Sequence, residues 1–231
     1  AMEVRLTDQI ELETTGSVGW RPGNAEISIV GRRWALDAVV EGGVYTAALN
    51  VDPDGNITGL AAQPSSPTIP ISLVPWTPTE LGPDMGSQDW APNGSEACYT
   101  SFAGGDIRIA DVLGNRRTIL TGVTGAALGP LWSPTGTKIL FYSGIDTGIE
   151  TISPSGTGRQ VIVRRTARYT IGAPSWSPTG SHIIHYRYTT WHVGPPAYYR
   201  YDVVRCTAAG GGASVLTGEL PSPGGFPIAW R

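Results

Sequence analysis

The chain has 231 residues, of which 40% are hydrophobic and 15% are charged, and its formal net charge at pH 7 is −3. Its 31 glycines and 19 prolines exclude long helices, because both residue types destabilise a helix interior. So few charges, with a slight acidic excess, predict no basic field for nucleic acid or for an anionic membrane surface. Many short strands joined by turns are expected instead.

Neither a membrane span nor a leader is expected. The sequence has no run of 18 apolar residues, and its first residues, Ala1-Met2-Glu3, do not resemble a secretory signal peptide. The two cysteines, Cys98 and Cys206, lack the C-x-x-C spacing of a zinc site. We expect both to be small buried side chains.

A short motif that begins with tryptophan recurs along the chain, at Trp20 (Trp-Arg-Pro-Gly-Asn), Trp90 (Trp-Ala-Pro-Asn-Gly), and Trp132 and Trp176 (both Trp-Ser-Pro-Thr-Gly). Trp230 stands where a fifth copy would begin, so the spacings are 70, 42, 44 and 54 residues. Two of these spacings match the roughly 40–45 residues of a four-stranded propeller blade. Each tryptophan is expected to be buried between neighbouring blades, with a tight turn after it.

In chain order, each copy continues with strands separated by turns. The predicted strands are 25–30, 44–49 and a weaker one near Ile57; then 96–100, 106–110 and 117–121; then 138–142, 148–152 and 160–163; then 181–186, 199–204 and 213–217. Asp54-Gly55 predicts a hairpin turn in the first copy. The order of strands and turns is the same in every copy, which indicates repeated structural units.

The pattern predicts an all-β fold, a β-propeller of four-stranded antiparallel blades that forms a single domain over residues 1–231. The repeats lie at about 16–63, 85–122, 125–165 and 168–218. Residues 2–8 and 224–231 look like the last and first strands of one partial blade shared by the two termini. This fits a five-bladed ring or a fragment of a six-bladed one, and the incomplete blade would offer an edge for a homo-oligomer.

Two insertions interrupt the repeats. Residues 61–84 carry six of the prolines and predict an ordered insertion or a long loop over one face. Residues 189–199 lengthen the loop between the middle strands of the fourth repeat. This loop supplies the candidate binding residues, Trp191, His192, Tyr198 and Tyr199, which would stack on a sugar ring or anchor a peptide. The alternative is that these aromatic side chains pack on their own blade.

Metal or cofactor binding is not expected. Within one strand His182 and His185 would point to opposite faces, and no carboxylate cluster accompanies His185 and His192. Residues 50–56, Asn-Val-Asp-Pro-Asp-Gly-Asn, have the opening spacing of a calcium loop. Its twelfth position is Ala61 instead of Glu, so we expect a turn.

Catalytic machinery is not evident in the sequence. There is no G-x-S-x-G motif and no set of helices to carry a hydrolase triad. Carboxylates that meet in space need not be near in sequence, which leaves paired acids open. The scattered acids are Asp37, Glu41, Asp89, Asp106, Asp111, Asp146, Glu150 and Asp202. The sequence favours a non-catalytic protein without settling the question.

The repeats resemble those of TolB-like, WD-like propellers, whose consensus is roughly P-x-W-S-P-D-G, followed by strands, a D-x-x-G turn and a last strand that ends in L-T. Residues 130–136 and 174–180 match closely, and Ile119-Leu-Thr121 and Val215-Leu-Thr217 match the repeat end. The resemblance covers residues 85–231 well and the first copy more loosely. Every copy has Thr, Asn or Gly in place of the consensus Asp.

The resemblance implies a non-catalytic scaffold that binds a protein or peptide on its loop face or at its central opening. It also implies an extracytoplasmic bacterial setting, periplasmic or secreted. Two alternatives stay open: a carbohydrate-binding or carbohydrate-cleaving propeller, and the propeller domain of a prolyl-oligopeptidase-type enzyme that lacks its hydrolase domain.

Overall fold

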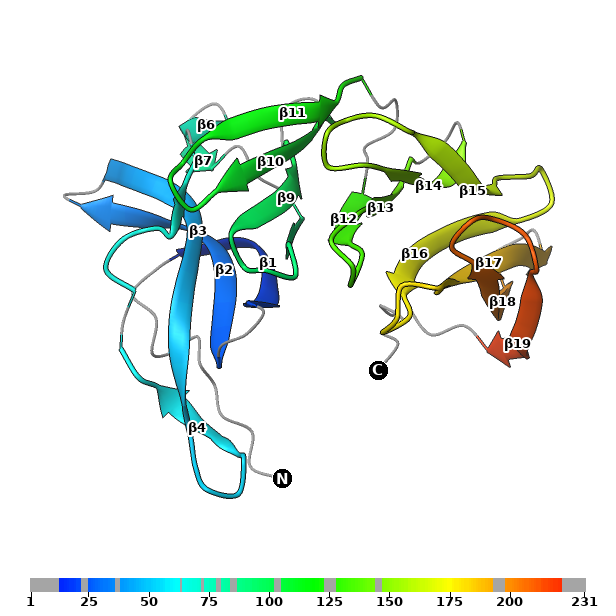
Figure 1. Cartoon of the computed structure of the whole chain (residues 1–231), viewed down its shortest axis with the longest axis horizontal. Coiled ribbons are helices and arrows are strands. Elements are labelled where there is room, and N and C mark those ends of the chain that lie inside the picture. The colour runs from blue at the N-terminus through cyan, green and yellow to red at the C-terminus, as the bar shows by residue number, and fades with distance from the viewer. Residues whose placement is uncertain are drawn as a thin grey trace. The chain divides into compact units, whose positions relative to one another are not determined.

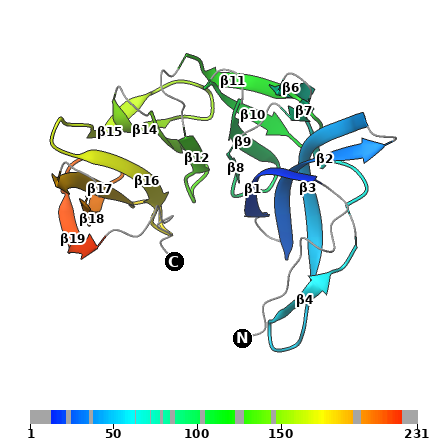
Figure 2. The same ribbon diagram turned by 180° about the vertical axis from the view of Figure 1, so that it is seen from behind.

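The computed structural model of the chain describes residues 13–21, 25–35, 38–62, 64–71, 73–77, 80–83, 87–101, 105–122, 128–143, 147–192 and 198–221 (Figures 1 and 2). Regular structure in these ranges is entirely β. The strands are β1 (Glu13–Arg21), β2 (Glu26–Ala35), β3 (Ala38–Val51), β4 (Ile57–Leu60), β5 (Ile69–Pro70), β6 (Leu73–Thr77), β7 (Glu80–Pro83), β8 (Gln88–Trp90), β9 (Glu96–Thr100), β10 (Ile107–Asp111), β11 (Arg116–Leu120), β12 (Leu128–Trp132), β13 (Ile139–Tyr142), β14 (Gly148–Ile152), β15 (Gln160–Arg164), β16 (Thr170–Trp176), β17 (His182–His192), β18 (Tyr198–Thr207) and β19 (Ser214–Pro221). A search of the described residues found no helix with the length and apolar character needed to span a membrane.

The chain divides into two compact units. The first comprises residues 1–103 and 108–117, and the second comprises residues 104–107 and 118–231. Each unit is described by itself below. The single domain over residues 1–231 stays a prediction.

The first unit contains a sheet with the strand order β1-β2-β3-β4, to which β5 adds by pairing with β3. The hairpin of β2 and β3 runs from the pair Glu26 and Ala48 to the pair Ala35 and Ala38. Residues 61–84 contribute β5 to this sheet and a separate hairpin of β6 and β7. The proline-rich insertion therefore includes ordered strands.

The core of the first unit joins this sheet to the next repeat. It consists of Val30, Val44, Ile69, Ile71, Trp90, Ala97, Tyr99 and Ala110, all buried. The guanidinium carbon of Arg21, at the end of β1, lies 5.1 Å from the centre of the Trp90 ring. Strands β8 to β11 form an antiparallel four-stranded sheet in sequential order.

Two four-stranded antiparallel sheets of sequential order, β12 to β15 and β16 to β19, make up most of the second unit. Their shared core contains Leu140, Ile149, Ile162, Ile171, Trp176, Ile183 and Cys206. The indole Nε1 of Trp176 donates a hydrogen bond to the Leu131 carbonyl of the preceding repeat, at 3.2 Å. Trp176 thus ties its sheet to the one before it, as the repeat pattern predicts.

The turn after the tryptophan uses a serine in the second unit. The backbone N–H groups of Thr137 and Lys138 donate to Ser133 Oγ at 3.1 and 3.0 Å, and His182 N–H donates to Ser177 Oγ at 3.0 Å. Gly136 and Gly180 have φ of 72° and 71°, which favours glycine. These serine hydroxyls accept the turn amides, so the turn holds without the consensus Asp.

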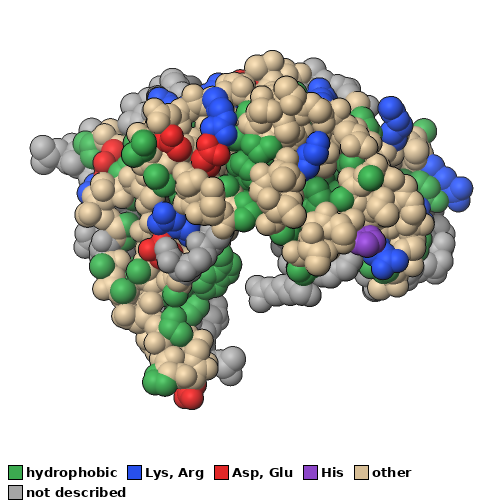
Figure 3. Space-filling model, in the orientation of Figure 1, with side chains coloured by type: hydrophobic (Ala, Val, Ile, Leu, Met, Phe, Trp, Pro, Cys, Tyr) green, Lys and Arg blue, Asp and Glu red, His purple; other side chains and the backbone are tan. Residues whose placement is uncertain are grey.

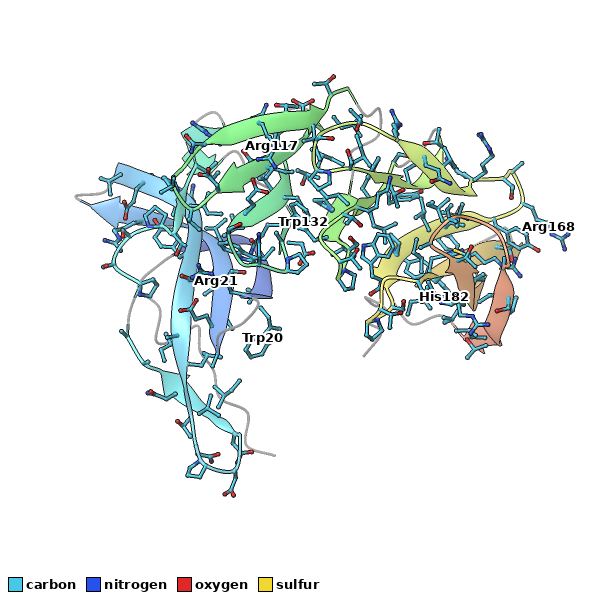
Figure 4. The ribbon with its side chains drawn as sticks, in the orientation of Figure 1. Trp20, Arg21, Arg117, Trp132, Arg168 and His182 are labelled. Atoms are coloured by element: carbon cyan, nitrogen blue, oxygen red, sulfur yellow. The ribbon has the colours of Figure 1, made fainter. Side chains whose placement is uncertain are left out.

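The prediction that the repeat tryptophans are buried is correct for three copies and wrong for one. Trp90, Trp132 and Trp176 are 3%, 7% and 8% exposed, whereas Trp20 is 56% exposed. Trp90 and Trp176 each pack against the first strand of the repeat before them. Since β1 is the first described strand, no described strand precedes Trp20 to cover it (Figure 4). Trp230 lies outside the described residues.

Both cysteines are buried and free, as predicted. Cys98 is 0% and Cys206 is 2% exposed, and neither forms a disulfide. Burial raises the pKa of both thiols, so each behaves as a small apolar side chain.

Candidate functional site

The fourth repeat carries a long hairpin. Strands β17 and β18 have 11 and 10 residues, whereas their counterparts have 4 or 5 in the second and third repeats; β2 and β3 of the first repeat have 10 and 14. Residues 189–199 were expected to form a loop, and for 189–192, 198 and 199 that expectation is wrong: β17 continues through His192, and β18 begins at Tyr198. These residues are rich in Thr, Tyr and Trp, which favour strands, and Thr189, Thr190 and His192 have backbone partners on β18. Residues 193–197 lie outside the described part of the chain.

The backbone register brings the four candidate binding residues to the end of this hairpin. His192 lies opposite Tyr198, and Thr190 lies opposite Tyr199, with an irregularity between Thr190 and His192 that includes Trp191. The side chains of residues 190–200 are outside the described part of the structure. Ligand binding by Trp191, His192, Tyr198 and Tyr199 therefore stays a prediction.

Below this end of the hairpin, three tyrosines pack together. The ring centres of Tyr188 and Tyr201 are 5.2 Å apart, and Tyr186 lies 6.4 Å from Tyr188 and 6.1 Å from Tyr201. Tyr188 and Tyr201 are direct cross-strand partners, and each of the three side chains is partly exposed. We call Tyr186, Tyr188 and Tyr201 the tyrosine cluster. The alternation Tyr-Arg-Tyr at 186–188 is the sequence signal for this cluster, because it places two tyrosines on the same face of one strand.

A glycine makes room for the cluster. Gly172 of β16 pairs with Tyr186, and a Cβ atom at residue 172 would lie 3.2 Å from the Tyr186 hydroxyl oxygen. The missing side chain lets the Tyr186 ring lie across the neighbouring strand. Burial raises the pKa of Tyr186, and the neighbouring tyrosines raise it further, so its hydroxyl is neutral at physiological pH.

Arginines surround the tyrosines. The guanidinium carbons of Arg187 and Arg168 lie 4.5 and 5.2 Å from the centre of the Tyr169 ring. Arg187 Nε also donates a hydrogen bond to Asp202 Oδ2, at 2.8 Å. Burial raises the pKa of Tyr142, and the charge of Arg165 partly offsets that rise. Neutral hydroxyl donors and cationic donors thus occur side by side.

The histidines of β17 do not form a metal site in the described structure. His185 is 2% exposed, and its Nδ1 lies 3.2 Å from the Tyr186 carbonyl, while His182 contacts Ser181 Oγ at 2.9 Å. Burial lowers the pKa of His185, which keeps its imidazole neutral. Among the described residues no group of three His, Cys, Asp or Glu side chains is placed to hold a metal ion.

Glu150 is a buried carboxylate with a full set of donors. Arg159 Nε donates to Glu150 Oε2 at 2.6 Å, and Arg159 Nη2 donates to Oε1 at 3.0 Å. The Thr147 hydroxyl also donates to Oε1, and Ser143 contacts Thr147. Burial alone would raise the pKa of Glu150, but the hydrogen bonds from Arg159, Thr147 and Ser143 lower it overall. The group is an ionised structural carboxylate.

The acidic segment at residues 50–56 is a hairpin turn, as predicted, and its carboxylate serves the turn. Asp52 Oδ1 accepts the N–H groups of Asp54 and Asn56 at 3.0 and 2.7 Å, and Gly55 has φ of 84°. Asp111 accepts the N–H groups of Leu113 and Asn115, both at 2.9 Å, in the corresponding turn of the second repeat.

Other described acids are also engaged. The pairs are Glu26 with Arg21 at 2.9 Å, Glu41 with Arg33 at 3.4 Å and Glu96 with Arg117 at 2.5 Å; Asp106 accepts Gly122 N–H at 3.3 Å. Asp89 also makes an interaction. Asp37 and Asp146 lie outside the described residues.

Comparison with known proteins identifies the fold of the chain. No protein-family model and no curated protein matches the chain. Among solved structures, a putative TolB from Agrobacterium tumefaciens shares 18% identity with a TM-score of 0.51, over 84% of this chain and 63% of that one. TolB from Acinetobacter baumannii shares 14% with a TM-score of 0.54, over 87% and 43% of the two chains. An oligogalacturonate lyase from Vibrio parahaemolyticus shares 10% with a TM-score of 0.54, over 91% and 68%.

These similarities and the repeated four-stranded antiparallel sheets define the class: the chain has a β-propeller fold. Within that class its fold is TolB-like, as the repeat motifs imply. The chain spans less than two thirds of the length of either TolB.

Proposed function

We propose that this protein is a non-catalytic propeller that binds a protein or peptide through the tyrosine-rich hairpin of the fourth repeat. The observation that carries the proposal is the lengthening of β17 and β18 beyond their counterparts in the second and third repeats, directly above the tyrosine cluster. The added length brings the aromatic residues Trp191, Tyr198 and Tyr199 to the end of the hairpin. Tyrosine and tryptophan dominate the energetics of protein interfaces because they bury a large area at small entropic cost.

The carboxylates support a non-catalytic role. A glycoside-cleaving site needs two acids free to act as proton donor and as base or nucleophile. Glu150 and Asp202 are held by arginines, and Asp52 and Asp111 accept turn amides. The resemblance to TolB supports a protein or peptide partner and an extracytoplasmic bacterial setting. The propeller of a prolyl-oligopeptidase-type enzyme stays an alternative.

The test removes the hairpin without disturbing the sheet. Since Thr189 and Arg200 are direct partners, residues 190–199 can be replaced by Asn-Gly, which forms a two-residue turn between paired strands. A random peptide library is selected on the immobilised full chain, and the affinities of enriched peptides are measured by fluorescence anisotropy. The variant is expected to weaken binding about 30-fold, the loss of a hot spot.

Leu113→Ala serves as the control, because Leu113 is 82% exposed in the first unit. It is expected to leave the affinities unchanged. Enriched peptides that bind the hairpin variant as tightly as the natural chain would overturn the proposal. So would a saturating tryptophan-fluorescence response to oligogalacturonate in the absence of any enriched peptide, which would support the carbohydrate alternative.

A further inference from the structure

The charges of the chain are divided unequally between its two units. The second unit contains nine Lys and Arg residues and five Asp and Glu residues, a formal charge of +4. The first unit contains seven Lys and Arg residues and fourteen Asp and Glu residues, a formal charge of −7. The net charge of −3 is thus the sum of two opposite contributions. The net charge of the whole chain, from which no basic field was predicted, does not show this difference between the units.

Three of the arginines follow one another at the end of β15. Arg164, Arg165 and Arg168 are all exposed and lie in or just after that strand. A turn fixes this segment: Tyr169 N–H contacts the Thr166 carbonyl and hydroxyl, both at 3.3 Å, and the two residues form an isolated bridge. In the view of Figure 3 the rim around β15 and this turn shows basic side chains and no acidic ones. Arg168 points away from the unit (Figure 4).

Part of this positive charge has no ion-pair partner in the described ranges. Among the described residues, no carboxylate lies within ion-pair distance of Arg164 or Arg168, whereas Arg159 and Arg187 hold Glu150 and Asp202. Arg168 shares the Tyr169 ring with Arg187, which brings two cations to one aromatic ring. Such a cluster is stabilised by an added anion.

The tyrosines extend this basic segment. Successive side chains of a strand point to opposite faces, so Arg187 and Tyr169 lie on the other face of β17 from Tyr186 and Tyr188. On the face of the tyrosine cluster, the charge of Arg165 and the hydroxyl of Tyr188 both act on the Tyr142 hydroxyl. We call Arg164, Arg165, Arg168, Tyr169 and Arg187 the arginine rim. Its guanidinium forks and the nearby tyrosine hydroxyls are donors that match carboxylate oxygens.

We propose that the arginine rim, together with the tyrosine cluster, binds an acidic polypeptide segment rich in Asp and Glu. This inference rests on the proposed function, because it names the chemistry of the partner that the hairpin region receives. Carboxylates of the partner pair with Arg164 and Arg168, and its backbone and side chains contact the tyrosines. Acidic surface then meets basic surface, which speeds association and selects the partner.

The geometry favours a peptide over a sugar or a single-stranded nucleic acid. Both of those ligands are held largely by stacking on open aromatic faces. Here the Tyr169 ring lies under two guanidinium groups, and the rings of the tyrosine cluster pack against one another. The surface therefore presents hydrogen-bond donors and ring edges to a ligand.

The experiment uses the full chain and a fluorescein-labelled peptide of alternating Glu and Gly, with a Lys and Gly peptide for comparison. Anisotropy is expected to show binding of the Glu peptide alone, weakening several-fold between about 50 and 300 mM NaCl as screening increases. Arg164→Gln with Arg168→Gln is expected to weaken binding about tenfold, since each lost ion pair removes part of the electrostatic attraction.

The matched control is Lys138→Gln with Arg205→Gln, which changes the net charge equally in the same unit. Lys138 begins the stretch that leads into β13, and Arg205 lies near the far end of β18 from Tyr198. This control is expected to change the affinity less than twofold, because its charges lie away from the rim. Equal weakening by both double variants would overturn the inference, since it would show a response to net charge alone.

Other ligands and partners give distinct results. Tighter binding of oligothymidine or of oligogalacturonate than of the Glu peptide would replace the inference with a nucleic-acid or uronate ligand. The chain could also associate with itself at low salt. If Arg164→Gln with Arg168→Gln abolishes that association, the acidic partner is a second copy of this chain.

If library peptides bind through the hairpin but show no acidic bias, the inference fails and the proposed function stands. If the Glu peptide and the library peptides all bind the hairpin variant unchanged, the proposed function fails and the arginine rim stands as a site of its own.

Discussion

At the scale of single residues, Glu150 is the buried acid of the described structure, at 1% exposure, and its ion pair is only half-buried because the Arg159 side chain is 44% exposed. Glu150→Gln removes the charge and keeps the shape. Its expected loss in the free energy of unfolding is about 1 to 2 kcal/mol, below that of a fully buried pair, since Arg159 can turn to water. Urea denaturation measures this loss.

The control is Glu96→Gln, whose Arg117 partner is 46% exposed. It is expected to lose about 0.5 kcal/mol or less in the free energy of unfolding. Equal losses in the two variants would contradict the structural role of Glu150.

The same carboxylate predicts a pH dependence. The folded pKa of Glu150 is lowered by its hydrogen bonds, so its stabilising effect is present above the unfolded pKa of about 4.3 and is lost as the pH falls through the folded pKa. Unfolding midpoints measured from pH 5 downward should therefore fall less steeply in Glu150→Gln than in the natural chain. Parallel curves would show that Glu150 does not titrate with folding.

His185 predicts a second, separate pH window. Burial lowers its folded pKa, so the folded state prefers the neutral imidazole. Its contribution is complete above the unfolded pKa of about 6.5 and is lost as the pH falls from there toward the folded pKa. His185→Gln is expected to make the midpoint of unfolding less dependent on pH between pH 7 and 5.5. An unchanged slope in His185→Gln would contradict the burial of a neutral imidazole at this position.

At the scale of elements, Gly43 shows why β5 can join the first sheet. Gly43 pairs with Pro70, and a Cβ atom at residue 43 would lie 2.2 Å from the Ile69 carbonyl oxygen. Gly43→Ala must push β5 away and expose Ile69, which is fully buried. We expect a loss of about 2 to 4 kcal/mol in urea denaturation, the range for a disrupted core contact. Gly19→Ala meets only Ser28 Oγ at 3.4 Å and should change stability little; similar losses would refute the steric explanation.

Local patterns predicted the elements whose partners are near in sequence. The strands at 96–100 and 148–152 have the predicted bounds, and Asp54-Gly55 makes the predicted turn. The β5 strand carries no such signal, because a pairing of residues 69 and 70 with Gly43 and Val44 depends on a contact far along the chain. The strand extensions at 189–192 and 198–199 could not be predicted from the composition of a segment with Gly, Pro and aromatic residues, because they depend on pairing between the two arms of the hairpin.

At the scale of the whole molecule, the site was only partly predictable. The aromatic residues at 191–199 stood out as an insertion, but the tyrosine cluster did not, since Tyr186 and Tyr201 are far apart in sequence and meet through the register of β17 and β18. The arginine rim was hidden by the net charge, because summing over all residues cancels the excess of one unit against that of the other.

The solvent exposure of Trp20 can be measured to test whether the face of the first sheet is open in solution. At 56% exposure, with Val18 beside it on β1 at 63%, Trp20 should be readily quenched by iodide, and Trp176 at 8% should be shielded. Trp20→Phe is therefore expected to remove a quenchable part of the emission and to change stability by less than about 0.5 kcal/mol, as at other surface positions. Trp176→Phe should remove a shielded part and destabilise the fold by about 1 to 3 kcal/mol, because it leaves a cavity and breaks the bond to Leu131.

Shielding of Trp20 would contradict an open face and would require a cover. Light scattering then separates two covers. A mass near 24.4 kDa would mean that the chain covers Trp20 with its own residues outside the described ranges. A dimer that Trp20→Arg dissociates would mean that a second copy covers it, since a buried guanidinium without a partner opposes association far more than an exposed one does. The tryptophan motif would then direct assembly between chains by the same contact that joins successive repeats within one.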